Sequence, residues 1–382
     1  MIVLEEPYAS EPLLSWLASS RHPVLDNEFA RSCARDGALN LVAAKEAARR
    51  IEEGERVCTN SENALSWVAA NVRDEELTRA IGLFKDKAAM RRALAPLSPG
   101  LFFRTCSAEE LFDLDFRELE PPFVLKPSVG FCSMGVHAVE SREEWERALA
   151  DIRRSARTWG ALYPESVIGS ESFVLEGYVD GVEYALDAYF DETGAAQVLN
   201  VLRHDFASPS DTSDRLYLTS PAIVRENART MAAWLDQANA LVGARNLPVH
   251  VEVRVKDGQV TPIEFNPLRF AGLGGTDISW HAYGYRTYEA FLDGTPPDFD
   301  AAFAGKDDKV YAMSLLNPPS DATGGERFDY EAFASRFSHV LELRPFDVRR
   351  VGSYGFLFLE TDPSTAGELS FIMRTDLREF LR

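Results

Sequence analysis

The chain has 382 residues, of which 46% are hydrophobic and 26% charged, so it is long enough for two or three domains with cores of their own. Its formal net charge of −20 disfavours nucleic acid and anionic membranes as partners. No stretch approaches the roughly 20 apolar residues that span a bilayer, and the short acidic start is unlike a signal peptide. Four cysteines without a CxxC pair favour a reducing, cytoplasmic location.

The first eighty residues predict a small α/β unit, because short apolar strands alternate with helices. Strands are expected at 2–4, 23–25 and 56–58, and helices at 12–19 and from a cap at Asn60 or Ser61 through Trp67. Such alternation implies a parallel sheet. No GxGxxG follows the first strand, so a dinucleotide-binding fingerprint is absent.

The remaining residues predict a mixture of strands and long helices. Helices are expected over 85–94, 142–159 and 223–242, and the segment 123–206 is otherwise rich in strands. In the tail, strands are expected near 311–315, 340–343 and 355–359. These tail strands are too apolar to stay exposed, so we expect them to pack onto the rest of the protein.

The segment VEVRVKDGQVTPIEFN, residues 251–266, predicts a β-hairpin that carries carboxylates and an amide in otherwise apolar strands. A two-residue Asp257-Gly258 turn would place Glu252 and Glu264 on opposite faces of the sheet. A three-residue loop, Lys256 to Gly258 with Gly258 left-handed, is preferred because it makes one face wholly apolar. In that register the core face holds Val249, Val251, Val253, Val255, Ile263 and Phe265, and the other face holds Glu252, Arg254, Glu264 and Asn266.

Two interpretations of this polar face are open on the hairpin alone. It is a solvated outer face, as in most alternating strands, or it is a Mg²⁺ site, because hard cations take carboxylate and amide oxygens. His250-x-Glu252 also matches part of the zinc-deaminase signature, but no PCxxC follows, which excludes that interpretation.

A second informative stretch is PPFVLKPSVGFCSMGV, residues 121–136. A strand delivers Lys126, and a Gly/Ser-rich loop with Ser133 and Gly135 follows before the next strand. Glycines let backbone N–H groups approach an anion, and Lys126 adds a positive charge. The stretch is no Walker A loop, since a strand rather than a helix follows; the alternative is a plain turn.

A third stretch, SFVLEGYVDGVEYALDAYF at 172–190, holds a strand with Glu176, a break over 177–181, and a strand with Glu183 and Asp187. A carboxylate beside exposed strand backbone suits an adenine edge, and a second one suits ribose hydroxyls. The alternative is an ordinary acidic surface hairpin.

The order of these motifs, with a basic residue near a helix start before them, resembles the ATP-grasp superfamily of carboxylate–amine ligases over about residues 85–275. The resemblance implies an N-terminal parallel-sheet domain, then a two-lobed α+β ATP-grasp fold, with a small C-terminal α+β extension. The expected domains are 1–82 (preceding α/β domain), 83–206 (small lobe), 207–305 (large lobe) and 306–382 (extension).

The resemblance also implies the roles of individual residues. Lys87, with Lys85 as competitor, and Lys126 match the phosphate-binding lysines, and residues 128–135 match a loop over the triphosphate. The adenine hinge corresponds to Glu176, Tyr178 and Val179, and Glu183 to the ribose carboxylate. The metal triad corresponds to Glu252, Glu264 and Asn266.

The substrate residues are less directly matched. The family often has Asn-x-Arg after the triad, whereas Arg269 here stands three residues beyond Asn266. Arg269 is nevertheless a candidate for the acylphosphate, with Lys126 as the second catalytic candidate. A Gly-rich turn at Gly274-Gly275 opens a helix predicted to be capped by Thr276 or Asp277 and to run to about Phe291; its start could hold a substrate carboxylate. Arg203 is a further substrate candidate.

The implied reaction is ATP-dependent joining of a carboxylate to an amine through an acylphosphate, with release of ADP and phosphate. ATP and Mg²⁺, or Mn²⁺ in its place, are the implied cofactors. The expected partners are small-molecule carboxylate and amine substrates, without nucleic acid or membrane, and a homodimer is allowed for. The alternatives are an ATP-grasp carboxylase, or a non-catalytic nucleotide-binding or interaction protein on the same fold.

Overall fold

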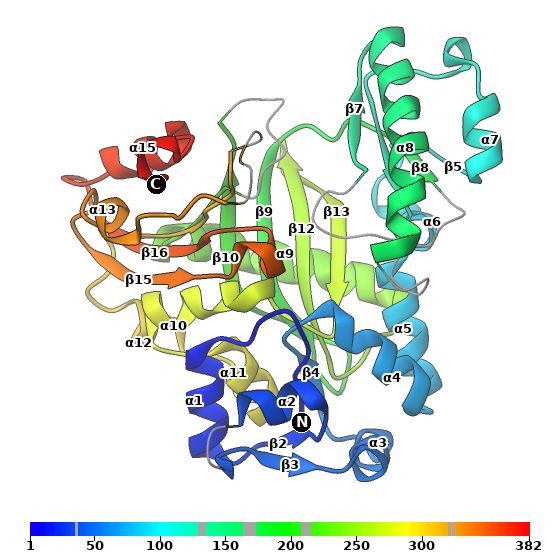
Figure 1. Ribbon diagram of the computed structural model, residues 1–382. Helices are drawn as coiled ribbons and strands as arrows, with labels where there is room; N and C mark the ends of the chain where they lie inside the picture. The colour runs from blue at the N-terminus through cyan, green and yellow to red at the C-terminus, as the bar shows by residue number, and fades with distance from the viewer. Residues whose placement is uncertain (35–36, 129–134, 163–172, 208–214, 320–321, 323–324) are drawn as a thin grey trace.

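The computed structural model describes residues 1–382 except 35–36, 129–134, 163–172, 208–214, 320–321 and 323–324. The N-terminal unit holds a parallel four-stranded sheet of order β3-β2-β1-β4, with helices packed around it (Figure 1). Its elements are β1 Ile2–Val3, α1 Glu11–Ser20, β2 Pro23–Leu25, α2 Glu28–Cys33, β3 Asn40–Val42, α3 Ala44–Glu52, β4 Cys58–Thr59, η2 Glu62–Ala64, α4 Leu65–Asn71 and α5 Glu75–Lys85. The predicted parallel sheet is confirmed, and β3 is a strand that the sequence pattern did not reveal.

The small lobe is built on an antiparallel sheet of order β5-β8-β6-β7, which α8 covers (Figure 1). Phe123 and Trp145 meet edge to face in its core, with ring centroids 5.8 Å apart. The elements are α6 Lys87–Leu94, η3 Ala95–Leu97, β5 Phe103–Cys106, α7 Ala108–Asp113, η4 Phe116–Glu118, β6 Phe123–Pro127, β7 His137–Val139, α8 Arg142–Leu162 and β8 Phe173–Gly177.

The large lobe and the C-terminal extension share one antiparallel eight-stranded sheet of order β13-β12-β9-β10-β11-β14-β16-β15. The large-lobe elements are β9 Val182–Phe190, β10 Ala196–Asp205, β11 Leu216–Thr219, α9 Pro221–Val242, β12 Leu247–Lys256, β13 Gln259–Pro267, η5 Gly272–Asp277, α10 Ile278–Tyr283, α11 Thr287–Asp293 and α12 Phe299–Phe303. The extension adds β14 Val310–Leu315, α13 Tyr330–Ala334, β15 Val340–Pro345, α14 Val348–Val351, β16 Gly355–Thr361, α15 Gly367–Arg374 and η6 Arg378–Phe380.

The pairing of the strands confirms one expectation about organisation and corrects another. The three tail strands do exist, and they continue the large sheet through β14, which pairs with β11. However, β9 and β10 were expected in the small lobe and instead pair within the large sheet. A boundary at residue 206 is therefore wrong for the sheets, which divide between Gly177 and Val182. The predicted small lobe extends too far along the chain because the sequence of a strand does not show which sheet the strand joins.

Helix α5 ties the N-terminal unit to the large sheet. Its Asp74 cap accepts a hydrogen bond from the Leu77 N–H, and apolar residues three or four apart give it one buried face. On that face Phe84 stacks on Phe265 of β13, with ring centroids 4.3 Å apart. The chain continues directly into α6, which Asp86 caps. The helix predicted over 85–94 is α6, which begins two residues later at Lys87 because Asp86 caps it, and α5 before it was not predicted.

The register of the β12–β13 hairpin is set by a two-residue turn and a β-bulge rather than by the predicted three-residue loop. Its turn has two residues, Asp257 and Gly258, with φ of 51° and 79°, so the predicted three-residue loop is wrong. A β-bulge then shifts the pairing, so that Glu252 faces Glu264 and Val253 faces Pro262. Ile263 is the extra residue; it is half-buried rather than part of the core face.

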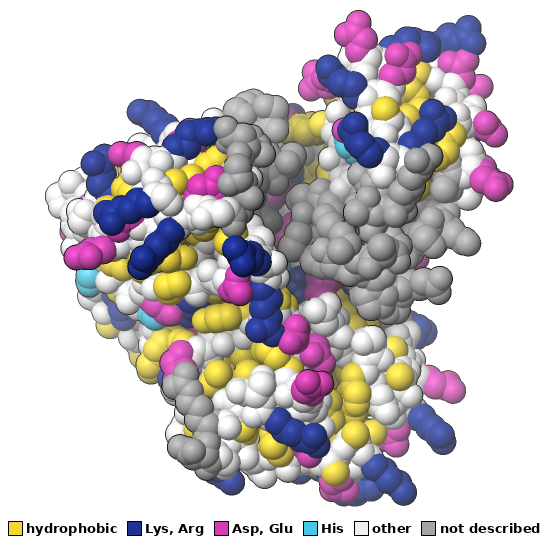
Figure 2. All heavy atoms as spheres, in the orientation of Figure 1, with side chains coloured by type: hydrophobic (Ala, Val, Ile, Leu, Met, Phe, Trp, Pro, Cys, Tyr) yellow, Lys and Arg dark blue, Asp and Glu magenta, His cyan; other side chains and the backbone are white. Residues whose placement is uncertain are grey.

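The surface in Figure 2 carries acidic and basic side chains interspersed over the described part of this face. None of the helices in the described ranges is long and apolar enough to cross a bilayer.

Gly181, in the connection between β8 and β9, provides a test of this arrangement. Its φ is +123°, and a Cβ at this position would lie 2.5 Å from the carbonyl oxygen of Val255 in β12. Gly181→Ala should therefore lower the free energy of unfolding by roughly 2 kcal/mol or more, since strain and overlap act together. Urea unfolding followed by circular dichroism measures the loss.

Gly258→Ala is the matched control, because Gly258 also has a positive φ (+79°) but no atom of the described residues lies within 4 Å of its would-be Cβ. This substitution should lower the free energy of unfolding by about 1 kcal/mol, the cost of a non-glycine residue in the left-handed conformation. Equal losses of unfolding free energy in the two variants would contradict the close contact between Gly181 and the Val255 carbonyl oxygen of β12.

Candidate functional site

One face of the large sheet carries a row of polar side chains on neighbouring strands. Glu252 faces Glu264, and His250 faces Asn266, across β12 and β13. On β9, Glu183 and Asp187 share this face, because they pair with Arg254 and His250 of β12. The bulge makes this gathering possible, since without it Glu252 and Glu264 would point to opposite faces. The structure therefore brings together the three residues predicted as metal ligands.

The donor set of this triad fits Mg²⁺. Glu252 and Glu264 are partly exposed, with side-chain exposures of 24% and 20%, whereas Asn266 is buried. The buried Asn266 Oδ1 atom has no hydrogen-bond partner among the described residues, which is costly unless a ligand supplies one. Two carboxylates and an amide oxygen are ligands of the kind that Mg²⁺ takes; within the described ranges no group of three His, Cys, Asp or Glu side chains forms a metal-binding cluster.

Lys87 lies at the first position of α6, and its Nζ is 2.9 Å from Glu264 Oε2. Burial acts to raise the pKa of Glu264, but the charge and hydrogen bond of Lys87 outweigh it and hold that pKa at about 2. Burial acts to lower the pKa of Lys87, but the charge of Glu264 outweighs burial and raises the pKa of Lys87 above its ordinary value. Both groups are therefore charged at neutral pH. Lys85, the competing candidate, instead pairs with Glu62.

A second buried set of charges holds Lys126 in place. Glu176 lies between two cations, with Lys126 Nζ 2.5 Å from Oε1 and Arg91 Nε 2.5 Å from Oε2. Burial raises the pKa of Glu176, but Lys126 and Arg91 together bring it to about 2. Burial, with Arg91 and Lys87 nearby, lowers the pKa of Lys126. Both Glu176 oxygens are thus engaged in holding Lys126 and α6, and a contact of Glu176 with adenine stays a prediction.

Beside this row lies a cavity of about 820 Å³ at the hinge between the lobes. Tyr178, Glu183 and Arg203, all predicted site residues, line it. Glu183 is buried, with Oε1 2.8 Å from His204 Nδ1 and Oε2 accepting from Arg254 Nε at 2.8 Å. Burial raises the pKa of Glu183, yet His204 and Arg254 bring it below the ordinary value. A carboxylate so held keeps further lone pairs for hydroxyl donors.

The hinge backbone is held from both sides. The Val179 carbonyl accepts a hydrogen bond from Arg254 Nη1 at 2.6 Å, and the Tyr178 N–H donates to Pro122 O at 3.3 Å. The Arg254 guanidinium also lies over the Tyr178 ring, 5.3 Å from its centroid. Arg254 therefore fixes both the hinge and the Glu183 carboxylate, a role that the sequence pattern did not reveal.

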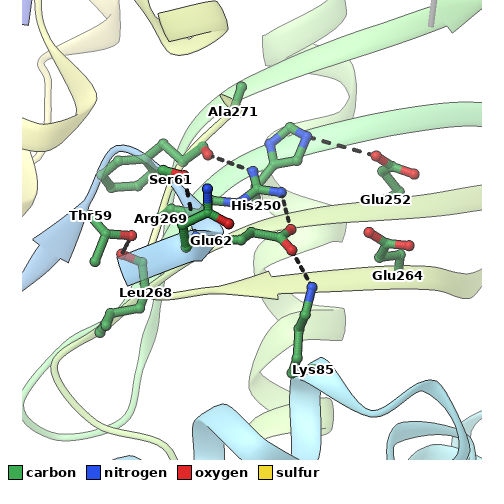
Figure 3. A network of polar contacts seen from close by, with 12 residues as sticks. Thr59, Ser61, Glu62, Lys85, His250, Glu252, Glu264, Leu268, Arg269 and Ala271 are labelled. Atoms are coloured by element: carbon green, nitrogen blue, oxygen red, sulfur yellow. Dashed lines mark hydrogen bonds and ion pairs between the residues drawn. The ribbon is translucent and has the colours of Figure 1, made fainter. Parts of the chain in front are cut away.

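Arg269 belongs to a network that includes the N-terminal unit. Its Nη2 lies 2.6 Å from Glu62 Oε1, and Lys85 pairs with the other Glu62 oxygen (Figure 3). Burial acts to raise the pKa of Glu62, but Arg269 and Lys85 bring it below the ordinary value. Figure 3 shows this network next to Glu264 and His250, so Arg269 lies beside the polar row of β12 and β13 despite its shifted spacing from Asn266.

Asp187 and His250 form a buried pair behind Glu252. Asp187 is fully buried; its Oδ1 is 2.8 Å from His250 Nδ1 and accepts the Ala271 N–H at 2.9 Å. His250 Nε2 is 4.0 Å from Glu252 Oε1. The pair therefore continues the polar row beside Glu252 and fixes the orientation of His250 next to it. The sequence signal for this pair is His250-x-Glu252, which predicts no contact with Asp187.

The remaining substrate candidates do not gather beside Glu252 and Glu264. Arg203 pairs with Asp205 at 2.7 Å and lies at the cavity. Added Cβ atoms at Gly274 and Gly275 would lie 2.6 Å from Arg344 Nη1 and 2.9 Å from Met313 Sδ, so close packing accounts for these glycines. A carboxylate on their backbone stays a prediction.

The helix predicted after this turn is not continuous. Neither Thr276 nor Asp277 caps it by a side-chain hydrogen bond, and Gly284, with a φ of +81°, separates α10 from α11. The single helix to Phe291 is therefore wrong, because a left-handed glycine ends it.

The base of the predicted phosphate loop is anchored on α6. Ser128 is buried, and its carbonyl accepts the Lys87 N–H at 2.8 Å. Gly135 has a φ of +70°. Ser133 and the rest of 129–134 lie outside the described residues.

Comparison with known proteins shows which family and which solved structures this chain resembles. Residues 119–277 match the family model described as the ATP-grasp domain. No curated protein matches the sequence. Solved structures of similar fold include an L-amino acid ligase from Bacillus licheniformis, at 18% identity and a TM-score of 0.71, with 100% of this chain and 97% of that chain covered.

Two further structures share the fold. One is N5-carboxyaminoimidazole ribonucleotide synthetase from Thermus thermophilus, at 18% identity and a TM-score of 0.60, covering 98% of this chain and 99% of that one. The other is a biotin carboxylase–β-γ-ATP complex from Campylobacter jejuni, at 13% identity and a TM-score of 0.63, covering 94% and 87%. Residues 119–277 thus match the ATP-grasp domain, and the chain as a whole shares the fold of these enzymes.

Proposed function

We propose that this protein is an ADP-forming ligase that joins a small-molecule carboxylate to an amine through an acylphosphate. The observation that carries the proposal is the metal face, where Glu252 and Glu264 lie opposite each other beside the unsatisfied Asn266 oxygen. The similarity in fold to an L-amino acid ligase, which extends over the whole chain, supports amino acids as the substrate class.

In this proposal the triphosphate lies between the two lobes. Lys87 and Lys126 neutralise its oxygens, and Glu183 accepts hydrogen bonds from the ribose. Glu252, Glu264 and Asn266 would hold Mg²⁺, which draws charge from the phosphate oxygens when bound. Arg269 is the candidate for the substrate carboxylate, because it lies at the metal face and carries a permanent charge.

The reaction then proceeds in two balanced steps. A carboxylate oxygen attacks the γ-phosphorus, a bond to the carboxylate forms, and the bond to the β-phosphate bridging oxygen breaks to release ADP. The amine nitrogen next attacks the acyl carbon, phosphate leaves with the oxygen that linked it, and the nitrogen loses a proton. The protein contributes position and charge rather than a covalent nucleophile.

The first test removes the metal ligands one at a time. Glu264→Gln should lower ADP formation about a hundredfold or more, because it removes an anionic ligand at the point of phosphoryl transfer. Asn266→Ala is a second variant, since its Oδ1 has no hydrogen-bond partner to lose in the described part of the chain. In both, Mg²⁺ should strengthen ADP binding less than in the wild type, as measured by calorimetry with and without the metal.

Glu192→Gln serves as control, because Glu192 is an exposed carboxylate with a side-chain exposure of 75%. Melting temperatures establish that every variant is folded. Wild-type turnover in Glu264→Gln, together with an unchanged effect of Mg²⁺ on ADP binding, would rule out the metal face.

The second test follows the carboxylate oxygen. A panel of amino acids is scored for release of ADP and phosphate, with bicarbonate included as a carboxylase control. With the best substrate labelled by ¹⁸O in its carboxylate, one labelled oxygen should appear in the released phosphate, since the acylphosphate breaks at its carbon–oxygen bond. Label in AMP instead would mean adenylation, and ADP release with bicarbonate alone would favour the carboxylase.

A further inference from the structure

The cavity at the hinge has a second wall, which comes from the C-terminal extension. Its lining from α15 and the residue before it consists of Ala366, Leu369, Ser370, Met373 and Arg374. Leu216 and Leu218 of β11 line it as well, and so does Phe206, directly after β10. In Figure 1, α15 and the small lobe lie on opposite sides of β9 and β12. Segments far apart in the sequence thus enclose one space.

The position of the cavity along the sheet tells which part of a nucleotide would occupy it. Arg254 lines the cavity, and Glu252 lies two residues away on the same face of β12, about 7 Å along the strand. Lys87, Lys126 and Glu264 do not line it. A triphosphate at the lysines and carboxylates therefore directs the opposite end of the molecule, the nucleoside, into the cavity.

The lining also suits a nucleoside chemically. Tyr178, Leu369 and Met373 offer apolar contact for the flat faces of a base, and Glu183 offers an acceptor for hydroxyl groups. Its volume of about 820 Å³ lies within the rough range of 300–1,000 Å³ for small-molecule sites. The exposed Arg374 adds a positive charge that favours an anionic nucleotide.

We infer that α15 forms one wall of the nucleoside pocket, where Leu369, Ser370 and Met373 lie against the adenosine part of ATP. The inference rests on the proposed function, since it takes ATP as the ligand. It gives the C-terminal extension a direct part in nucleotide binding. The extension is therefore expected to set affinity for the nucleoside without touching the phosphates.

Two substitutions test this wall. Met373→Ala removes apolar contact, and Ser370→Trp places a bulky ring in the cavity from an exposed position that packing of the extension does not need. Each should raise the Kd of MgADP and MgATP by about tenfold, equal for the two nucleotides because the change is remote from the phosphates. Affinity for inorganic pyrophosphate, which lacks the nucleoside, should not change.

Ser364→Trp is the matched control, an exposed serine shortly before α15 that does not line the cavity. Calorimetry gives each Kd, and melting temperatures confirm that the variants are folded. If nucleotide affinity is unchanged in both test variants while the wild type binds MgATP tightly, α15 does not contact the nucleoside, and the proposed function is unaffected. A raised KM for the carboxylate or amine alone would assign the cavity to a substrate instead. Absence of MgATP binding by the wild type would overturn both.

Discussion

The ion pair between Lys87 and Glu264 joins the start of α6 to the polar face of the large sheet, and the other charges of the site are arranged around it. Burying a single charge costs so much that each must have a partner. Lys126 therefore shares Glu176 with Arg91, and Arg269 shares Glu62 with Lys85. This pairing allows a protein with a net charge of −20 to collect several cations in one place.

Local patterns in the sequence predicted much of the fold, because they report directly on periodicity and caps. The long helix α9, the parallel N-terminal sheet and the three tail strands follow from such patterns. The predictions that were wrong concern features that depend on tertiary contacts. Strand composition does not say which sheet a strand joins, so β9 and β10 were assigned to the small lobe. Nor could the pattern show that Gly284 ends α10, because glycine is also tolerated inside helices.

The candidate site could be predicted as a set of residues but not as a set of contacts. Glu252, Glu264 and Asn266 do share a face, yet through a bulge at Ile263 and a two-residue turn rather than the loop that was preferred. An alternating pattern favours a regular ladder, and a bulge leaves no simple trace in it. The roles of Arg91, Arg254 and Glu62 were missed for a related reason, because each acts through a partner that is distant in sequence.

The same ion pairs bear on how a nucleotide could enter. If Lys87 turns to a phosphate, Glu264 loses the cation that keeps its pKa at about 2, and it then faces a triphosphate of the same charge. That arrangement is unfavourable unless another cation arrives with the nucleotide. A divalent ion bound to the phosphates supplies it, and the unsatisfied Asn266 oxygen lies ready beside Glu264. Under the proposed function, the closed ion pairs thus select the metal complex of ATP over the free nucleotide, so selectivity for MgATP follows from the cost of an unpaired buried carboxylate.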